Sequence, residues 1–237
     1  MAFSVCLHDV AAFLDGFFEI ARYDEDVNGI FRDSARPVSR LGVGLEPSPT
    51  LPDQVRDHHL DALVLHRPWK LSDYPLPDDI GVLAYHLPFD EHLTVGYNLR
   101  LADVLQLRDV EVLGEKDGRP LGMIGTWRTA SLEKTTATVR DIFGGLEARY
   151  AGRFDEVSRV AVVGAMTPEL IDHASKQGAD VYVTGQYRKR AEDAVRATGV
   201  SVLEVGHARS ERWGVGGLEH LLRERFNGVA TLNLLNP

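Results

Sequence analysis

The sequence predicts an α/β protein made of two similar α/β halves related by pseudo-twofold symmetry, with mixed sheets flanked by helices. Three observations lead to this fold class. Short apolar strands alternate with amphipathic helices of about 8–15 residues, which is the pattern of βαβ units. One stretch of the sequence is repeated in the second half of the chain. An Asp-Gly pair between two strands indicates a hairpin, which adds antiparallel pairing to an otherwise parallel sheet.

The repeat joins residues 40–66, RLGVGLEPSPTLPDQVRDHHLDALVLH, to residues 159–185, RVAVVGAMTPELIDHASKQGADVYVTG, at a constant offset of 119 (159 − 40). Each copy continues into a further apolar strand, GVLAYH or SVLEVGH. A duplicated unit of this kind predicts two halves, 1–115 and 116–237, which could exchange elements. The residues identical between the copies are Arg40 and Arg159, Val43 and Val162, Pro49 and Pro168, Leu51 and Leu170, Asp53 and Asp172, Asp61 and Asp180, and Val64 and Val183.

In the first half, Val10, Phe13 and Phe17 recur at helical spacing and predict the first helix. The segment LDALVL is short and continuously apolar, as expected of a strand that is covered on both faces. A proline-rich stretch over 70–80 predicts a loop long enough to fold over a site. The elements predicted in this half are a helix over 7–19, a strand over 41–45, a helix over 50–58, strands over 61–65 and 81–85, a helix over 98–106 and a strand over 109–113.

In the second half, the turn EKDGRP separates two strands and predicts the hairpin. The segment SLEKTTATVRDIF is amphipathic, and we expect its helix to end at Gly144. Thr167 provides a hydroxyl cap before Pro168, which is favoured at the first position of a helix. The elements predicted here are a strand over 121–127, a helix over 131–144, a strand over 159–164, a helix over 168–176, a strand over 180–184, a helix over 188–198, a strand over 201–205 and a helix over 213–226.

The composition argues against several classes of function. No run of about 18 apolar residues is present to span a membrane, and Cys6 is the sole cysteine, which excludes an internal disulfide. We therefore expect a cytoplasmic protein with no membrane partner. The formal net charge of −9 disfavours nucleic acid as the main partner, because phosphate recognition needs a basic face. The best local basic patch is Arg188–Arg190.

Four polar residues stand where predicted strands end, the place at which open α/β sheets present functional groups. His66 ends the strand LDALVL, and Asp90 follows the strand GVLAYH in a His-x-x-x-Asp segment that starts at His86. His207 and Glu211 follow the strand SVLEV at the same spacing, and they would lie one turn apart if His207 begins a helical turn. Imidazole nitrogen and carboxylate oxygen together suit zinc, manganese or iron(II). The pattern predicts a metal site, although a lone His at a strand end is also a common hydrogen-bonding turn residue.

Two other groups of polar residues are interpreted as structural. The pair His58-His59 is expected at the exposed end of a helix. In the turn YDEDVNG, Asp24 and Asp26 match the first half of a calcium-binding loop. The twelfth position of that pattern needs a bidentate Glu and is Ala35, so we interpret the segment as a solvated turn.

The order of these motifs resembles the Nif-three-like family, the dinuclear-metal-centre hexameric proteins often called type 2 GTP cyclohydrolase I homologues. The resemblance covers almost the whole chain. Family members carry His-His-Pro where this chain has His66-Arg67-Pro68, and Asp-x-Tyr-x-Thr-Gly-Glu where it has Gln186 in place of the Glu. The motifs His-x-x-x-Asp with a following Gly-x-Asn, and Gly-His-x-x-x-Glu, are shared. The matching residues are His66, Pro68, His86, Asp90, Gly96, Asn98, Asp180, Tyr182, Thr184, Gly185, Gly206, His207 and Glu211.

The resemblance implies metal ligands among these residues, with Arg67 at the place of one further ligand. A guanidinium is always protonated and has no lone pair to offer a cation. We therefore expect one divalent ion, zinc, manganese or iron, rather than two. Two alternatives stay open: a two-ion site that recruits water or His86, and a site that has lost its metal. The ligands that the resemblance implies are His66, Asp90, His207 and Glu211.

The resulting functional hypothesis is a metal-dependent hydrolase, similar to a GTP cyclohydrolase, that acts on a nucleotide or another phosphate-bearing small molecule. The cation would activate water, and Glu211 or Asp90 would accept the proton of that water. Arg67 would pair with the substrate phosphate as a two-pronged donor. The resemblance also implies a ring-shaped homo-hexamer. The alternative is a non-catalytic ring that acts as a scaffold or binds metal or nucleic acid, so whether the chain is an enzyme stays open.

Overall fold

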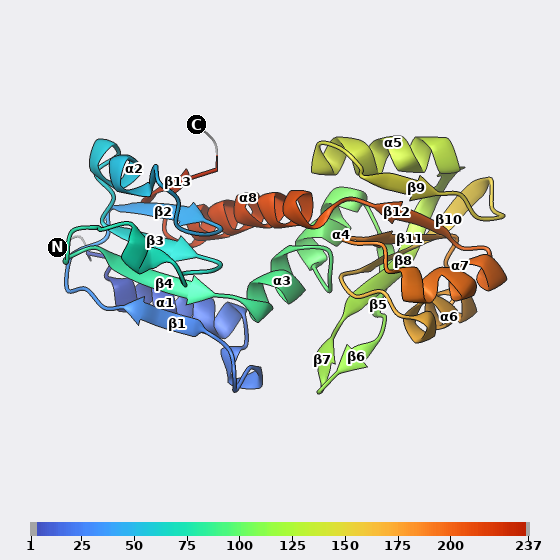
Figure 1. The fold of residues 1–237 in the computed structure, drawn as a ribbon, viewed down its shortest axis with the longest axis horizontal. Helices are drawn as coiled ribbons and strands as arrows, with labels where there is room; N and C mark the ends of the chain where they lie inside the picture. Colours follow the sequence, from blue (N-terminus) through green and yellow to red (C-terminus); the bar gives the residue numbers. More distant parts are fainter. Residues whose placement is uncertain (1–3, 236–237) are drawn as a thin grey trace. The chain divides into compact units, whose positions relative to one another are not determined.

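The structure is a computed structural model that describes residues 4–235, and its internal contacts divide the chain into two compact units (Figure 1). The first unit runs up to Phe89 and resumes at Gly214, and the second unit is Asp90–Trp213. This division differs from the predicted boundary between 115 and 116. The second unit is an insertion within the first, so the C-terminal part of the chain contributes to the sheet of the N-terminal part.

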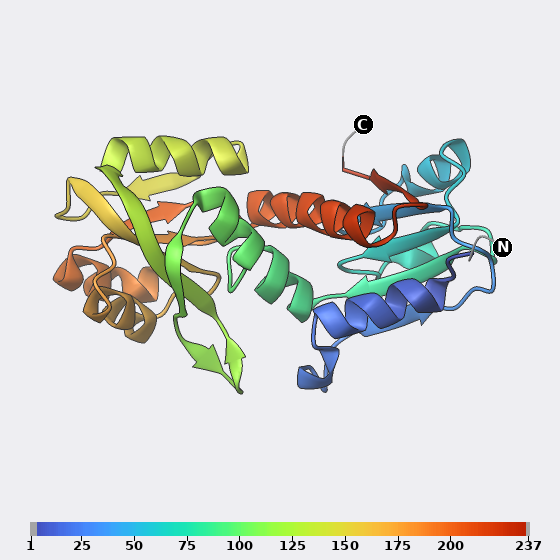
Figure 2. The same ribbon diagram turned by 180° about the vertical axis from the view of Figure 1, so that it is seen from behind.

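The first unit contains α1 (Leu7–Phe17), the 3-10 helix η1 (Ile20–Arg22), β1 (Asn28–Arg32), β2 (Arg40–Gly44), α2 (Leu51–Asp57), β3 (Ala62–Leu65), the 3-10 helix η2 (Leu71–Asp73), β4 (Gly81–Tyr85) and β13 (Ala230–Asn233). Its five strands form a mixed sheet in the order β1-β4-β3-β2-β13. The strands β13, β2, β3 and β4 are parallel, and the edge strand β1 is antiparallel to β4. Helix α1 covers one face of this sheet and α2 the other (Figures 1 and 2).

The second unit contains α4 (Leu99–Leu105), β5 (Arg108–Val112), β6 (Glu115–Lys116), β7 (Arg119–Pro120), β8 (Gly122–Ser131), α5 (Leu132–Phe143), β9 (Ala148–Tyr150), β10 (Glu156–Val163), α6 (Pro168–Lys176), β11 (Val181–Thr184), the 3-10 helix η3 (Lys189–Ala191), α7 (Glu192–Thr198) and β12 (Ser201–Glu204). Its main sheet has the order β5-β8-β10-β11-β12-β9. The strands β10, β11 and β12 are parallel, and the other pairings are antiparallel. Two helices, α3 (Leu87–Leu93) and α8 (His207–Arg225), run across the points at which the chain is divided.

The core of the second unit lies on both faces of its sheet. Val160 and Val162 of β10 pack with α4 and α5, whereas Ala161 and Val163 pack with α6 and α7. Figure 1 shows α5 on one side of this sheet and α6 and α7 on the other. Because both faces are covered, every residue of β11 and β12 is buried.

The repeat predicted from the sequence is present in the backbone pairing and in one hydrogen-bond motif. Asp61 Oδ2 accepts hydrogen bonds from the backbone N–H groups at the start of β2, and Asp180 Oδ2 accepts the equivalent pair near the start of β10. Each carboxylate therefore ties two neighbouring parallel strands together. The four bonds come from Ser39 at 2.8 Å and Arg40 at 2.9 Å to Asp61, and from Ser158 at 2.8 Å and Arg159 at 3.0 Å to Asp180.

The offset between the copies changes by one residue within the repeat. β3 pairs Ala62 with Gly81 of β4, whereas β11 pairs Val181 with Ser201 of β12. The offset is 119 at the first position of each pair (181 − 62) and 120 at the second (201 − 81). The second copy therefore carries one additional residue between its second and third parallel strands.

This extra residue corrects the predicted correspondence between the two His-x-x-x-carboxylate segments. With an offset of 120, His86 corresponds to Gly206 (86 + 120), and Leu87 corresponds to His207 (87 + 120). Leu87 and His207 are each the first residue of a helix, α3 and α8. The two histidines therefore occupy neighbouring but different positions of the repeated unit.

The other differences from the predicted elements have local causes. Helix α8 begins at His207 instead of 213, because Ser210 and Glu211 are polar residues that the fold buries and the apolar spacing does not reveal. The predicted hairpin is present, since β5 pairs with β8 and the intervening β6–β7 turn places Asp117 and Gly118 at φ of 52° and 73°. Within residues 4–235, no helix is long and apolar enough to cross a membrane.

Candidate metal centre

Three side chains that could hold a metal ion lie together at the carboxyl ends of β3 and β4. They are His66, His86 and Asp90, and one ligand atom from each lies within 4.8 Å of the others. β3 and β4 are neighbouring parallel strands, so the residues that follow them meet at one edge of the sheet. Asp90 is in the first turn of α3, the helix that continues from β4. His66 and Asp90 were predicted ligands, and His86 was the alternative ligand that the sequence left open.

Both imidazole rings are held through their Nδ1 atoms. His66 Nδ1 lies 3.1 Å from the carbonyl oxygen of Tyr85, and His86 Nδ1 lies 2.9 Å from Asp26 Oδ1. A carbonyl and a carboxylate accept hydrogen bonds, so the proton of each ring is on Nδ1 and the neutral ring has its lone pair on Nε2. Metal-binding histidines are commonly oriented in this way. The residues present therefore fit a divalent cation.

The position of His66 depends on a fixed Tyr85. The phenol O–H of Tyr85 donates a hydrogen bond to Asp15 Oδ1 at 2.7 Å, and the Tyr85 ring packs on Phe18. Burial raises the pKa of the Tyr85 phenol above its ordinary value, and the hydrogen bond to Asp15 raises it further. Tyr85 is therefore a neutral, rigid part of the core whose carbonyl holds the buried His66 ring in place.

Asp26 is a functional candidate that the sequence interpretation missed. Its Oδ2 atom accepts the backbone N–H of Leu87 at 2.7 Å, while Oδ1 faces His86, so one carboxylate holds both the ring and the start of α3. The Asp26 side chain is only 11% exposed and is not the solvated group that we expected. The backbone N–H of His86 also donates to Asn28 Oδ1 at 3.2 Å. No spacing rule reveals these contacts, because β1 reaches His86 only through tertiary pairing with β4.

The other two predicted ligands are adjacent on the first turn of α8. His207 Nε2 lies 3.0 Å from Glu211 Oε1. The Glu211 side chain is 4% exposed, whereas that of His207 is 63% exposed. His207 therefore begins a helical turn with Glu211 one turn further on, as the sequence predicted conditionally.

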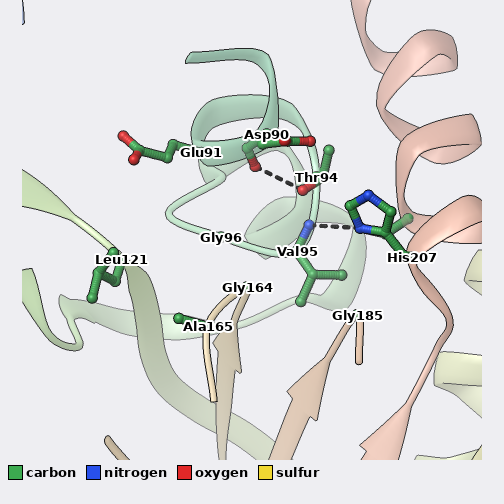
Figure 3. Close-up of a pocket in the computed structure, with 11 residues that line it drawn as sticks. Asp90, Glu91, Thr94, Val95, Gly96, Leu121, Gly164, Ala165, Gly185 and His207 are labelled. Atoms are coloured by element: carbon green, nitrogen blue, oxygen red, sulfur yellow. Dashed lines mark hydrogen bonds between the residues drawn. The ribbon is translucent and has the colours of Figure 1, made fainter. Parts of the chain in front are cut away.

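Asp90 and His207 line one hollow of about 180 Å³ in the second unit (Figure 3). In Figure 3, Asp90 comes from α3 and His207 from α8, and Gly164, Ala165 and Gly185 follow the ends of β10 and β11. A Cβ atom at Gly164 would lie 2.6 Å from the carbonyl oxygen of Val95, so this wall requires glycine. Asp90 thus belongs both to the group with His66 and His86 and to the hollow lined by His207. The convergence of all four predicted ligands on one cation stays a prediction.

Several residues of the family-like motifs hold the scaffold and do not line the hollow. Asn98 caps α4 by accepting the N–H of Leu101 at 3.1 Å. The phenol oxygen of Tyr182 donates to the carbonyl of Ala165 at 2.6 Å. The backbone N–H of Arg67 donates to the carbonyl of Leu45 at 2.7 Å, which fixes the chain directly after His66. The role of the Arg67 guanidinium toward a substrate stays a prediction.

A comparison with protein families matches residues 70–235 to the family described as Duf34/NIF3 (NGG1p interacting factor 3). This match covers more than half of the chain, from the loop after β3 to two residues beyond β13. It includes three of the four predicted ligands and omits His66.

Curated relatives match the chain over nearly their whole lengths. A "GTP cyclohydrolase 1 type 2 homolog" from Pyrococcus horikoshii is 29% identical and covers 97% of both chains. A protein with the same name from Pseudomonas aeruginosa is 28% identical and covers 94% of both chains.

Solved structures agree with the fold. TTHA1606 from Thermus thermophilus has a TM-score of 0.76 at 23% identity, with 98% of this chain and 99% of that chain covered. A Bacillus cereus protein related to NIF3 has a TM-score of 0.74 at 17% identity, with 98% and 97% covered. At these identities the likeness shows the fold alone.

Proposed function

We propose, from the premise that the chain belongs to the Duf34/NIF3 family, that it binds a divalent metal ion and hydrolyses a nucleotide or another phosphate-bearing small molecule. The observation that carries the proposal is the group formed by His66, His86 and Asp90, whose ligand atoms lie within 4.8 Å of one another. The name that the curated relatives share, GTP cyclohydrolase 1 type 2 homolog, supports a nucleotide-directed activity.

Each residue of the proposed site has a role that follows from its chemistry. His66 and His86 would bind the metal through Nε2, because their Nδ1 atoms are engaged by a carbonyl and a carboxylate. Asp90 would add a carboxylate oxygen, and we propose that His207 and Glu211 complete the ligand set. A bound zinc, manganese or iron(II) ion would supply Lewis acidity for hydrolysis.

The remaining steps belong to side chains of the protein. Whichever of Asp90 and Glu211 is less engaged by the ion would accept the proton of the attacking water. Arg67 would form paired hydrogen bonds with a substrate phosphate, because its planar guanidinium matches two phosphate oxygens. Arg67 also has no lone pair for a metal, so we propose one ion per chain and not two.

The first experiment counts metal in the full-length protein after equilibration with zinc, manganese or iron(II). Elemental analysis should give one equivalent per chain, and Arg67→His should add a second equivalent. Two tight equivalents in the unmodified protein would overturn the assignment of Arg67, and an absence of tight binding by every metal would overturn the metal site itself.

The second experiment tests catalysis. Metal-loaded protein should release product from nucleotides or phosphate esters, and His66→Ala protein should not. Metal binding with no turnover across these substrates would favour the alternative, a non-catalytic ring that binds metal or serves as a scaffold. A steep salt dependence of DNA binding without turnover would favour the nucleic-acid form of that alternative.

We also propose a cytoplasmic homo-hexamer, with the ring-shaped assembly taken from the family resemblance. Native mass spectrometry tests the assembly directly, because a hexamer of a 26.3 kDa chain differs clearly from a monomer or dimer. A monomer as the sole species would contradict this part of the proposal.

A further inference from the structure

The most unusual side chain near the candidate metal centre is Trp69. It is 56% exposed, whereas Trp127 is 8% exposed and Trp213 is partly buried. Tryptophan is strongly buried on average, because its large apolar surface is costly to leave in water. Trp69 meets the ring of His86 edge to face, with 4.9 Å between the ring centroids. An exposed indole thus lies against one of the three side chains that could hold the metal.

The backbone around Trp69 is fixed on both sides. The N–H of Arg67 donates to Leu45 O at 2.7 Å, and the N–H of Leu71 donates to Pro68 O at 2.9 Å. Pro68 is buried and Leu71 is 8% exposed, so the residues around Trp69 are packed into the first unit while the indole is not. The indole is therefore presented from a rigid turn, which lowers the entropy cost of binding a ligand to it.

The charges next to Trp69 favour an anionic ligand. Arg67 lies two residues before Trp69, and the exposed Lys70 directly follows it, in a chain whose net charge is −9. An exposed indole that lies beside a candidate metal centre, with two cationic residues within two positions in sequence, matches a molecule with an aromatic ring and a phosphate. A phosphate without a ring would leave the indole exposed to water.

We propose that Trp69 is the specificity-determining residue of the candidate metal centre, where it stacks on the aromatic base of the substrate. The substrate class is then a nucleotide and not a non-aromatic phosphate ester. This inference rests on the proposed function, because it assigns a role to Trp69 through its contact with His86. Stacking of a base on an aromatic side chain contributes about 1–3 kcal/mol, which corresponds to a change of about 5-fold to 150-fold in affinity.

The experiment measures the dissociation constants of four probes for the full-length, zinc-loaded protein by calorimetry. The probes are adenosine 5′-monophosphate, adenosine, ribose 5-phosphate and inorganic phosphate. Trp69→Ala should weaken both ring-bearing probes by about 5-fold to 150-fold and should leave ribose 5-phosphate and inorganic phosphate unchanged. Trp69→Phe should retain most of the affinity, because phenylalanine keeps an aromatic face. Lys70→Gln is the matched control and should weaken only the probes that carry phosphate.

Tryptophan fluorescence gives a second readout. Adenosine 5′-monophosphate should quench the emission of the unmodified protein and should not quench Trp69→Phe, in which Trp127 and Trp213 remain. Equal loss of all four probes in Trp69→Ala, or no loss of any, would overturn the stacking role. A change of native mass in Trp69→Ala without a change in probe affinity would also overturn it and would assign the indole to a contact between copies.

Failure of this inference is distinguishable from failure of the proposed function. The zinc content of Trp69→Ala, measured by elemental analysis, should equal that of the unmodified protein, because the indole is not a ligand. If zinc binds and the ring-bearing probes do not depend on Trp69, the metal site stands and the stacking role is wrong. If zinc does not bind to the unmodified protein, the proposed function is wrong.

Discussion

The two copies of the repeated unit have the same framework and differ at the carboxyl edge of their strands. In the first unit, the residues that follow β3 and β4 are His66 and His86. At the equivalent places of the second unit stand Gly185 (66 + 119) and Gly206 (86 + 120). One copy therefore presents imidazoles, and the other leaves space at the edge where its own hollow is found. The two copies therefore share the strand framework and differ in the side chains that follow the strands, which are histidines in one copy and glycines in the other.

The backbone limits how far these edge residues can be exchanged. Gly206 has a φ of +92°, a conformation that side-chain-bearing residues rarely adopt, and a Cβ atom there would meet the Glu147 side chain. Gly185 is different, because a Cβ atom there would meet only His207 Cα at 3.9 Å. Of the two glycines that stand in place of the histidines, Gly185 is thus the one that tolerates substitution.

The largest expected effect tests whether His66 is a ligand that has no counterpart at Gly185, the equivalent position of the second copy. His66→Ala should lower zinc affinity by at least about 100-fold, because it removes a ligand, whereas changes to groups that merely orient ligands cost about 10–100-fold. Gly185→Ala, at the equivalent position, should leave zinc affinity unchanged. Calorimetric titration with zinc checks both, with circular dichroism as the test of folding. Similar zinc affinities for His66→Ala and Gly185→Ala would contradict the proposal that His66 is a ligand and that Gly185 has no such role.

The second test asks whether the shared framework is equally important in both copies. Asp61→Ala and Asp180→Ala should each lower the free energy of unfolding by about 2–3 kcal/mol, because each leaves two backbone N–H groups without their charged acceptor. Urea unfolding followed by hydrogen exchange should assign the loss to the first unit for Asp61 and to the second for Asp180.

A matched control for this pair comes from the same repeat. Asp53 and Asp172 are also identical at the offset of 119, but both are exposed. Asp53→Ala and Asp172→Ala should change the free energy of unfolding by no more than about 0.5 kcal/mol. A loss at Asp53 as large as that at Asp61 would show that the strand-tying bonds are not the cause.

The third test concerns Asp26, whose carboxylate holds the ring of His86 in the first unit. His86 Nδ1 and Leu87 N–H contact different oxygens of Asp26, and Asp26→Asn replaces one of these oxygens with an NH2 group that cannot accept. Zinc affinity should fall by about 10-fold, which is the lower end of the effect of groups that orient ligands. The exposed Asp24→Asn should have no effect, and an equal fall in both variants would point to a general loss of negative charge.

The smallest expected effect is on the free energy of unfolding when Gly164, which lines the hollow in the second copy, is replaced by alanine. Gly164→Ala should lower the free energy of unfolding by about 1–2 kcal/mol, because its Cβ atom would lie 2.6 Å from Val95 O. Gly216→Ala lies within α8 with open space around it and should be neutral or stabilising by up to about 1 kcal/mol. Thermal unfolding of the two variants in parallel checks the opposite signs.

Periodicity and turn chemistry predicted most of the fold. The helix over 168–176 is found with its predicted bounds, because Thr167 caps it and Pro168 starts it. The parallel strands were predicted from continuous apolar runs that both faces of the sheets bury. The strands β1, β9 and β13 were not predicted, because they are short edge strands whose sequences become strands only by pairing with distant neighbours.

The candidate site was predictable where it depends on strand ends and not where it depends on tertiary contacts. His66 and Asp90 follow parallel strands, and the rule that such strands end at one edge is sufficient to group them. Asp26 contacts His86 although 60 residues of sequence separate them. The repeat offset also changes by one residue, so His86 and His207 do not occupy equivalent positions. Neither fact can be read from the spacing of polar residues.

The pairing of β13 with β2 sets the order in which a newly made chain can complete its parts. Leu232 pairs with Gly42, a separation of 190 residues (232 − 42), and the entire second unit lies between them. A nascent polypeptide thus exposes His66 and His86, which follow β3 and β4, long before β13 leaves the ribosome, while the inserted unit already has all of its residues. We expect the inserted unit to fold first and the sheet edge that carries His66 and His86 to be completed after translation of β13.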